Sequence, residues 1–146
     1  MPEPLRQRTM ITLRLVLGAI LIYAAYVKIA AGWLSFAASV GSYEILPDWA
    51  VIFVANWLPW FELVLGLLVV SGFGIRWTGT LTTVLLAAFF AAVTRAYMMG
   101  LKIDCGCFGP GEELGALTLL RDGSFLAMAV LLTVFAFWPS RRVRVG

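Results

Sequence analysis

The chain has only two cysteines, Cys105 and Cys107, and the single residue Gly106 separates them. A disulfide between them would close a very small ring, and the departure from relaxed geometry makes such a bond easier to reduce. The ring would enclose almost no chain, so it would add little stability by restricting the unfolded state. Reversible redox chemistry or soft-metal binding therefore explains the pair better than a structural crosslink. The alternative of two incidental thiols in a glycine-rich turn stays open.

The sequence contains no histidine, which removes the commonest general base and the commonest metal ligand. Two thiolates at this spacing suit Cu(I), and the thioethers of Met98 and Met99 could add sulfur, although these methionines fit ordinary packing better. Three glycines and a proline predict a tight turn rather than a helix around the cysteines, in the string Asp104-Cys105-Gly106-Cys107-Phe108-Gly109-Pro110-Gly111.

The rest of the chain has the composition of an integral membrane protein. Of its 146 residues 62% are hydrophobic and only 13% are charged, with a mean hydropathy of +0.94. About a quarter of residues are charged in soluble domains, so soluble, nucleic-acid-binding and secreted disulfide-rich classes are excluded. Since lipid leaves backbone groups no partner except each other, we predict one all-α membrane domain over residues 1–146, an antiparallel four-helix bundle. The expected spans cover residues 10–31, 49–72, 77–99 and 118–138, and the loop 100–117 carries the cysteines.

The segment between the first two spans has its own pattern. Trp33, Phe36, Ala37 and Val40 recur at helical spacing, with serines elsewhere on the helical wheel. This pattern predicts a short amphipathic helix lying in the membrane interface. An extended loop is the alternative.

The distribution of basic residues predicts the orientation of the spans. Seven arginines fall on one side of the predicted membrane, with Glu3 as the only acid there: Arg6, Arg8, Arg14, Arg76, Arg141, Arg142 and Arg144. By the positive-inside rule both termini are cytoplasmic, and the loops 32–48 and 100–117 are extracytoplasmic. The prediction is a multi-pass protein of a bacterial cytoplasmic membrane, with its cysteines where disulfides persist.

Three of the ionisable residues inside the predicted spans are selected as functional candidates. Glu62 lies near the middle of the second span, whereas Lys28 and Arg95 lie in the outer parts of the first and third. Such residues are costly in lipid and are functional candidates by default. We predict a partner for Glu62 inside the bundle, with Lys28 the first choice and Arg95 the second. The alternative is that both cations extend to the interface while Glu62 is protonated or has a purely structural hydrogen bond.

Charges near the cysteines would tune their reactivity. Arg95 or Arg121 could stabilise a thiolate, which is the reactive form of cysteine. The negative charge of Asp104 would oppose this effect unless Asp104 is itself paired.

The string Asp104-Cys105-Gly106-Cys107-Phe108-Gly109, in the third loop of a four-span protein, resembles the MauE branch of the DoxX-like membrane proteins. The resemblance covers about residues 15–138, and Asp122 stands where asparagine is more usual. Other features that fit the same pattern are Lys28, Tyr43, Leu46-Pro47, Leu58-Pro59, Glu62 and Arg121-Asp122.

This resemblance implies a redox-associated inner-membrane protein that works with a thioredoxin-fold partner in maturing disulfide-containing exported proteins. MauE itself is linked to the disulfide-rich small subunit of methylamine dehydrogenase. A quinone cofactor enters only by analogy with four-helix enzymes that carry thiol electrons to quinone, because this chain lacks their second cysteine pair.

We therefore predict a membrane thiol–disulfide redox protein, an oxidoreductase if it turns over, that acts through Cys105 and Cys107. Asp104, Gly106, Glu62, Lys28, Arg95 and Arg121 are the expected supporting residues. The alternatives are a Cu(I)-binding membrane protein that uses the same two thiolates, and a non-catalytic accessory subunit.

Overall fold

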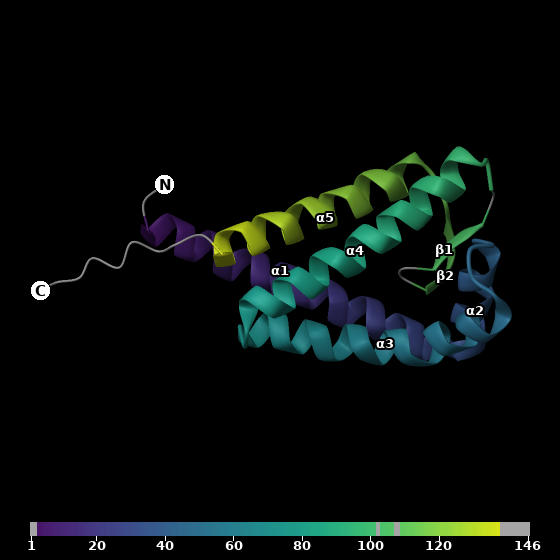
Figure 1. Cartoon of the computed structure of the whole chain (residues 1–146), viewed down its shortest axis with the longest axis horizontal. Helices are drawn as coiled ribbons and strands as arrows, with labels where there is room; N and C mark the ends of the chain where they lie inside the picture. The colour runs from purple at the N-terminus through teal and green to yellow at the C-terminus, as the bar shows by residue number, and fades with distance from the viewer. Residues whose placement is uncertain (1–2, 102, 107–108, 138–146) are drawn as a thin grey trace, which may run out of the picture.

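The computed structural model describes residues 3–101, 103–106 and 109–137, of which 3, 104–106 and 109–113 are described as backbone only. Four long helices are present: α1 (Glu3–Ala31), α3 (Asp48–Ser71), α4 (Ile75–Met98) and α5 (Ala116–Phe137). Each is long and apolar enough to cross a bilayer, which confirms the predicted four-helix membrane bundle. Figure 1 shows that consecutive long helices run in opposite directions.

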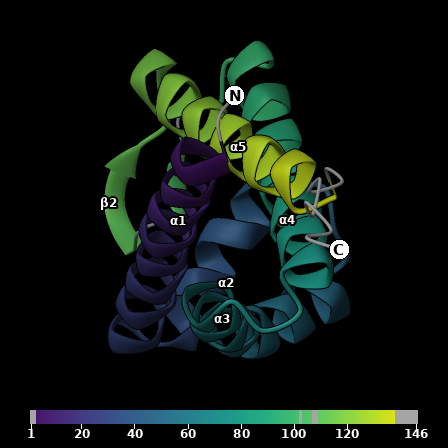
Figure 2. The same cartoon turned by 90° about the vertical axis from the view of Figure 1, so that its left-hand side faces the viewer.

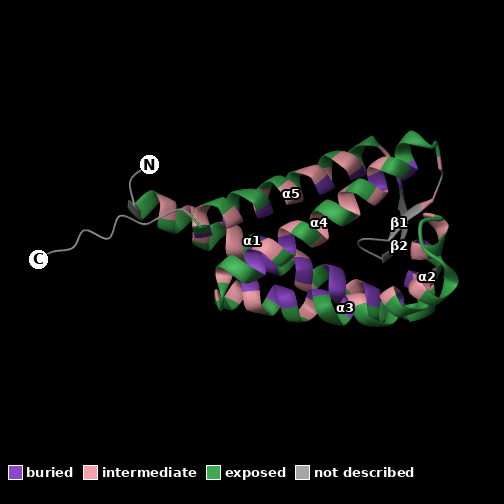
Figure 3. Ribbon diagram, viewed as in Figure 1, coloured by how far each residue is buried: buried purple, intermediate pink, exposed green. Residues whose placement is uncertain are grey.

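The long helices form a ring in which α1 packs on α3 and α5, and α4 packs on α5 and, more loosely, on α3 (Figure 2). Their buried residues face the middle of the bundle, while exposed residues cover the outside (Figure 3). One cluster of buried residues joins α1, α3 and α5 through Leu17, Val69, Ala129 and Leu132. Exposed apolar side chains on the outer faces agree with a protein whose surroundings are lipid.

Two glycines let α1 and α3 approach closely. A Cβ atom on Gly66 would lie 3.0 Å from the carbonyl oxygen of Gly18, and one on Gly18 would lie 3.0 Å from that of Gly66. Small residues at such crossings allow the backbone contact that drives helix association in lipid. The α1–α3 pair is therefore sensitive to any added side chain at this crossing.

Gly66→Ala is expected to lower the free energy of unfolding by about 1–3 kcal/mol, the usual effect of overpacking. Gly41→Ala in α2 is the matched control, because a Cβ there would first meet Val51 at an ordinary 3.9 Å. Alanine favours a helix over glycine, so the control is expected to be neutral or slightly stabilising. Unfolding in detergent measures both, and equal stabilities would show that the crossing is not tightly packed.

One end of the bundle is fastened by arginines that cap helix C-termini. Arg14 donates to the carbonyl oxygens of Val69 and Val70 at the end of α3, at 3.3 and 3.0 Å. At the end of α5, the carbonyl oxygens of Phe135 and Ala136 accept from Arg6 at 2.7 Å and from Arg76 at 3.2 Å. These bonds satisfy carbonyls left open by the helix and place positive charge at its negative end. We call Arg6, Arg14 and Arg76 the arginine end.

The arginine end also explains why α1 begins at Glu3 rather than near residue 10. The hydropathy of the sequence marks where apolar residues start, but the helix continues beyond them. Arg6 reaches α5 only from this added turn. Tertiary contact therefore extends the helix past its apolar segment.

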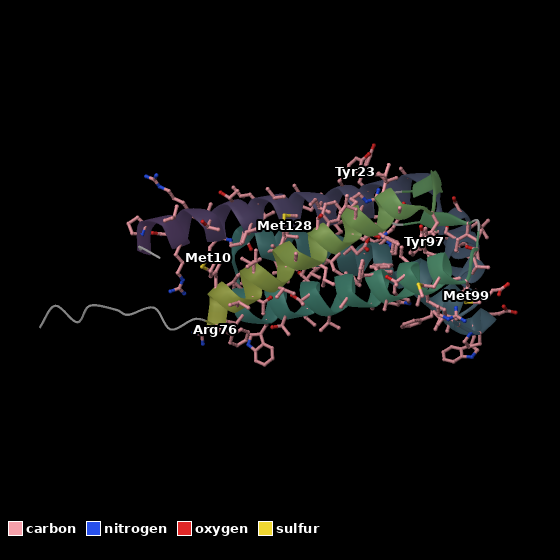
Figure 4. All side chains as sticks on the ribbon, turned by 90° about the horizontal axis from the view of Figure 1, so that it is seen from above. Met10, Tyr23, Arg76, Tyr97, Met99 and Met128 are labelled. Carbon is pink, nitrogen blue, oxygen red and sulfur yellow. The ribbon has the colours of Figure 1, made fainter. Side chains whose placement is uncertain are left out.

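The opposite end carries α2 (Trp33–Ser42) and a small antiparallel sheet of β1 (Asp104–Gly106) and β2 (Gly109–Glu113). Helix α2 is the short helix predicted between the first two spans, and it buries Phe36 and Ser39. Figure 4 shows Tyr97 and Met99 toward this end and Arg76 at the other.

The two strands were not expected from the glycine-rich sequence. Gly106 pairs with Gly109 and Asp104 pairs with Glu113 in antiparallel register. The two residues between the strands, which belong to the predicted tight turn, lie outside the described residues. We call strands β1 and β2 together the hairpin. Glycine and proline are poor strand formers, so pairing here depends on how the hairpin is held at its base.

The base of the hairpin is anchored in the bundle. The amide of Leu114 donates to the carbonyl oxygen of Ile103 at 2.9 Å, which closes the hairpin next to its strands. Leu114 is buried against Val93 and Ala96 of α4, and Tyr43 packs against the same cluster. The hairpin also contacts α1 and α2.

Candidate functional site

A buried ion pair lies in the interior of the bundle. The Lys28 Nζ atom is 2.7 Å from both carboxylate oxygens of Glu62, and each residue is 2% exposed. The predicted internal partner of Glu62 is therefore confirmed, and it is the first choice, Lys28. The alternative in which Lys28 extends to the interface is wrong, because its ammonium group turns inward to the carboxylate.

Two phenylalanines flank the ammonium group of this pair. The centroids of the Phe36 and Phe89 rings each lie 5.1 Å from Lys28 Nζ, a distance typical of cation–π contact. Phe36 comes from α2 and Phe89 from α4, so the pair joins α1 and α3 to both of these helices. The short helix α2 therefore covers a buried charge as well as an apolar surface.

A small cavity adjoins the ion pair and brings a third ionisable side chain to it. Lys28, Glu62 and Asp122 line this cavity of about 30 Å³, together with Phe89 and Phe125. That volume is enough for one water molecule, which needs about 10–15 Å³ of this measure. Two carboxylates and one ammonium group therefore line a cavity that is large enough for one water molecule.

Asp122 is a site residue that the sequence analysis did not select. It is 6% exposed, and the Arg121 Nε and Nη2 atoms lie 3.3 and 3.4 Å from its Oδ1 atom. The expected role of Arg121 was to support a thiolate, but its described contact is this neighbouring carboxylate. An acid inside the fourth apolar segment was the signal that could have identified Asp122, since the same reasoning selected Glu62.

Arg95 does not join the ion pair. Its side chain is exposed in the last turn of α4, and its Nη1 atom donates to the carbonyl oxygen of Tyr43 at 3.1 Å. This position agrees with the alternative in which Arg95 extends toward the interface. Arg95 therefore ties α4 to the chain just after α2.

The cysteines are only partly covered by the structure. Cys105 lies in β1 between Asp104 and Gly106, and is described as backbone only. Cys107 lies outside the described residues, and so do the predicted disulfide and the predicted Cu(I) site that depend on it. Among the residues whose side chains are described, no group of three or more histidine, cysteine, aspartate or glutamate side chains is placed to hold a metal ion.

The hairpin and the ion pair are linked through α2. The hairpin contacts α2, and α2 supplies the Phe36 ring that covers Lys28. Figure 1 shows the hairpin beside α2 at the end of the bundle opposite the arginine end. Helix α2 therefore contacts both the strand that carries Cys105 and the lysine of the buried pair.

Comparison with known proteins identifies one family. The model of the family described as methylamine utilisation protein MauE matches residues 6–135, which include all four long helices almost completely and the hairpin between the last two. No curated protein and no solved structure matches the chain significantly.

Proposed function

Because the chain belongs to the MauE family of methylamine utilisation proteins, we propose that it exchanges thiols and disulfides with a thioredoxin-fold partner through Cys105 and Cys107. The observation that carries the proposal is the position of the strand with Cys105. That strand belongs to a hairpin at one end of the four long helices (Figure 1), a position that would put it outside the bilayer and within reach of a partner in water.

The proposed reaction moves two electrons and two protons. One cysteine thiolate attacks a sulfur of the partner's disulfide, forming a mixed disulfide and releasing the other partner sulfur as a thiolate. The second cysteine then attacks the mixed disulfide, which leaves an intramolecular disulfide here and a dithiol in the partner. The same steps in reverse oxidise the partner, so the relative reduction potentials set the direction.

The buried pair supports this function as a positioning element. Lys28 and Glu62 do not touch the hairpin in the described contacts, but Phe36 fixes α2 over them and the hairpin packs on α2. We count Lys28 and Glu62 as positioning residues and reserve a catalytic role for the cysteines.

The proposed orientation follows from the arginine end. Arg6, Arg14 and Arg76 lie at the end opposite the hairpin, and this charge bias favours a cytoplasmic location for that end. The hairpin then faces the oxidising side of a bacterial inner membrane, where a disulfide of exported proteins would be made or reshuffled.

The proposal is tested with the purified protein, a thioredoxin-fold probe protein and trapping of free thiols with a maleimide that shifts gel mobility. Reduced parent protein, mixed with the oxidised probe, is expected to lose both reactive thiols. The variants Cys105→Ser and Cys107→Ser cannot complete the second step, so at least one of them is expected to accumulate the mixed disulfide. Ser39→Ala in α2 serves as a control that keeps both cysteines.

Two outcomes would contradict the proposal. A parent protein that keeps both thiols in the presence of the oxidised probe would not be an exchange protein, and stoichiometric copper that is lost from either serine variant would favour Cu(I) binding. Full support of methylamine utilisation in cells by the double serine variant would instead show an accessory subunit.

A further inference from the structure

A second, much larger cavity opens between α2, α3 and α4. It has a volume of about 520 Å³ and is lined almost entirely by apolar side chains, with Arg95 and Tyr43 at the end near the hairpin. None of the buried ion-pair residues lines it. Its volume lies within the range of sites that bind small molecules.

The sequence of α4 explains why the space is empty of side chains. Ala88, Ala92 and Arg95 recur at helical spacing on the face that lines the cavity. The alanines leave only short side chains at these positions, between the longer side chains of Leu85 and Phe89 on the same wall. Figure 1 shows the two helices diverging from the turn that joins them toward the end that carries α2.

The shape of the cavity favours a single extended chain. Lining residues on α4 run from Leu85 to Arg95, which is about 15 Å along a helix. The cavity is thus elongated along α4, with apolar walls over most of its length and Arg95 at one end. An apolar space of this form suits a hydrocarbon chain joined to an anionic group.

The positive charge of Arg95, at one end of the cavity, favours an occupant with an anionic group at that end. Arg95 has five N–H donors, of which one bonds Tyr43. No ion pair joins Arg95 to a carboxylate in the part of the chain that the structure describes. A guanidinium group with free donors, next to an apolar channel, matches a phosphate with an attached hydrocarbon chain.

We propose that this cavity binds one anionic phospholipid, with its phosphate against Arg95 and one acyl chain along the alanine face of α4. Phe36 and Phe89 line the cavity and also flank Lys28, so the acyl chain would complete the apolar cover of the ion pair. The site is independent of the cysteines, and its test does not involve thiol chemistry.

The first arm of the test compares headgroups. Delipidated protein in detergent is supplied with phosphatidylglycerol or phosphatidylcholine, and native mass spectrometry counts the lipid retained. The parent is expected to retain one phosphatidylglycerol per chain. Arg95→Gln is expected to weaken this binding about tenfold relative to phosphatidylcholine, which corresponds to about 1.4 kcal/mol. Arg8→Gln, which removes another exposed arginine charge, from α1, is the matched control and is expected to bind like the parent.

The second arm fills the channel. Ala92→Phe is expected to abolish retention of both lipids while leaving the helix content of the protein unchanged, and Ala92→Leu replaces it if the larger side chain prevents folding. Retention at the parent's level in a folded Ala92 variant, or equal headgroup preference in Arg95→Gln and Arg8→Gln, would overturn the proposal. A neutral isoprenoid compound recovered from the parent at one per chain would also overturn it and assign the channel to that compound.

Discussion

Replacing Glu62 with leucine is expected to lower the free energy of unfolding by about 3–5 kcal/mol, because it leaves the buried ammonium of Lys28 without its partner. Both oxygens of Glu62 contact Lys28 Nζ at 2.7 Å, so the substitution removes two bonds to a charged donor in one step. Glu62→Gln keeps one acceptor in the same place and is expected to cost clearly less. Unfolding of the three proteins in detergent gives the comparison.

A paired substitution separates the ion pair from simple packing. The double variant Lys28→Leu, Glu62→Leu removes both charges, so we expect it to recover most of the stability that Glu62→Leu loses. Phe36 and Phe89 would then contact an aliphatic side chain in place of the ammonium group. If all forms proved equally stable, the carboxylate would not be packed against the lysine.

Gly106→Val is expected to shift the Cys105–Cys107 couple toward the dithiol while leaving the bundle intact. A ring closed between two such close cysteines is strained, so the parent potential is expected above the range of structural disulfides, which lie below about −300 mV. Valine at position 106 attaches a branched side chain to a backbone atom of that ring and so restricts the backbone angles that the ring requires. Each 1.4 kcal/mol of added strain raises the reduction potential by about 30 mV. The hairpin tolerates valine because Gly106 lies in β1, and valine favours strands.

The measurement is a titration of both proteins in glutathione redox buffers, with free thiols trapped at equilibrium. Gly106→Ala, with one methyl group, is expected to fall between the parent and the valine variant. A parent pair that stays reduced in every buffer would rule out the redox function and favour Cu(I) binding. A valine variant as easily oxidised as the parent would show that Gly106 is not needed by the ring.

The ion pair could be predicted from the sequence because lipid leaves few choices. A glutamate in the middle of an apolar helix needs an internal partner, and Lys28 was the first choice among the cations in the other predicted spans. The four long helices followed from the same constraint on backbone hydrogen bonds. An unpaired charge and an unpaired backbone group are both very costly in lipid, so the sequence alone predicts the ion pair and the helices.

The contacts that were not predicted depend on tertiary packing. Arg14 and Arg76 were counted as charges that orient the chain, and nothing local indicates that they reach helix ends 55 and 60 residues away. The strands of the hairpin depend on the buried cluster around Leu114. That cluster forms only when α4 and α5 have packed together. Asp122 was noted only in the family resemblance and was not selected as a site residue, because it lies in the first turns of its helix, where a charge at the interface is inexpensive.

The arginine end is the point about which α4 could rotate relative to α3. Arg14 ties α1 to the end of α3, and Arg6 and Arg76 tie α1 and α4 to the end of α5, beside the short turn between α3 and α4. Toward the other end of the bundle, α3 and α4 diverge (Figure 1). With 24 residues, α4 is a lever about 36 Å long, so a rotation of about 3° at the pivot moves its tip by about 2 Å. We expect α3 and α4 to separate more easily at the end that carries α2 than at the arginine end, which would let a hydrocarbon chain enter the cavity between them from the bilayer.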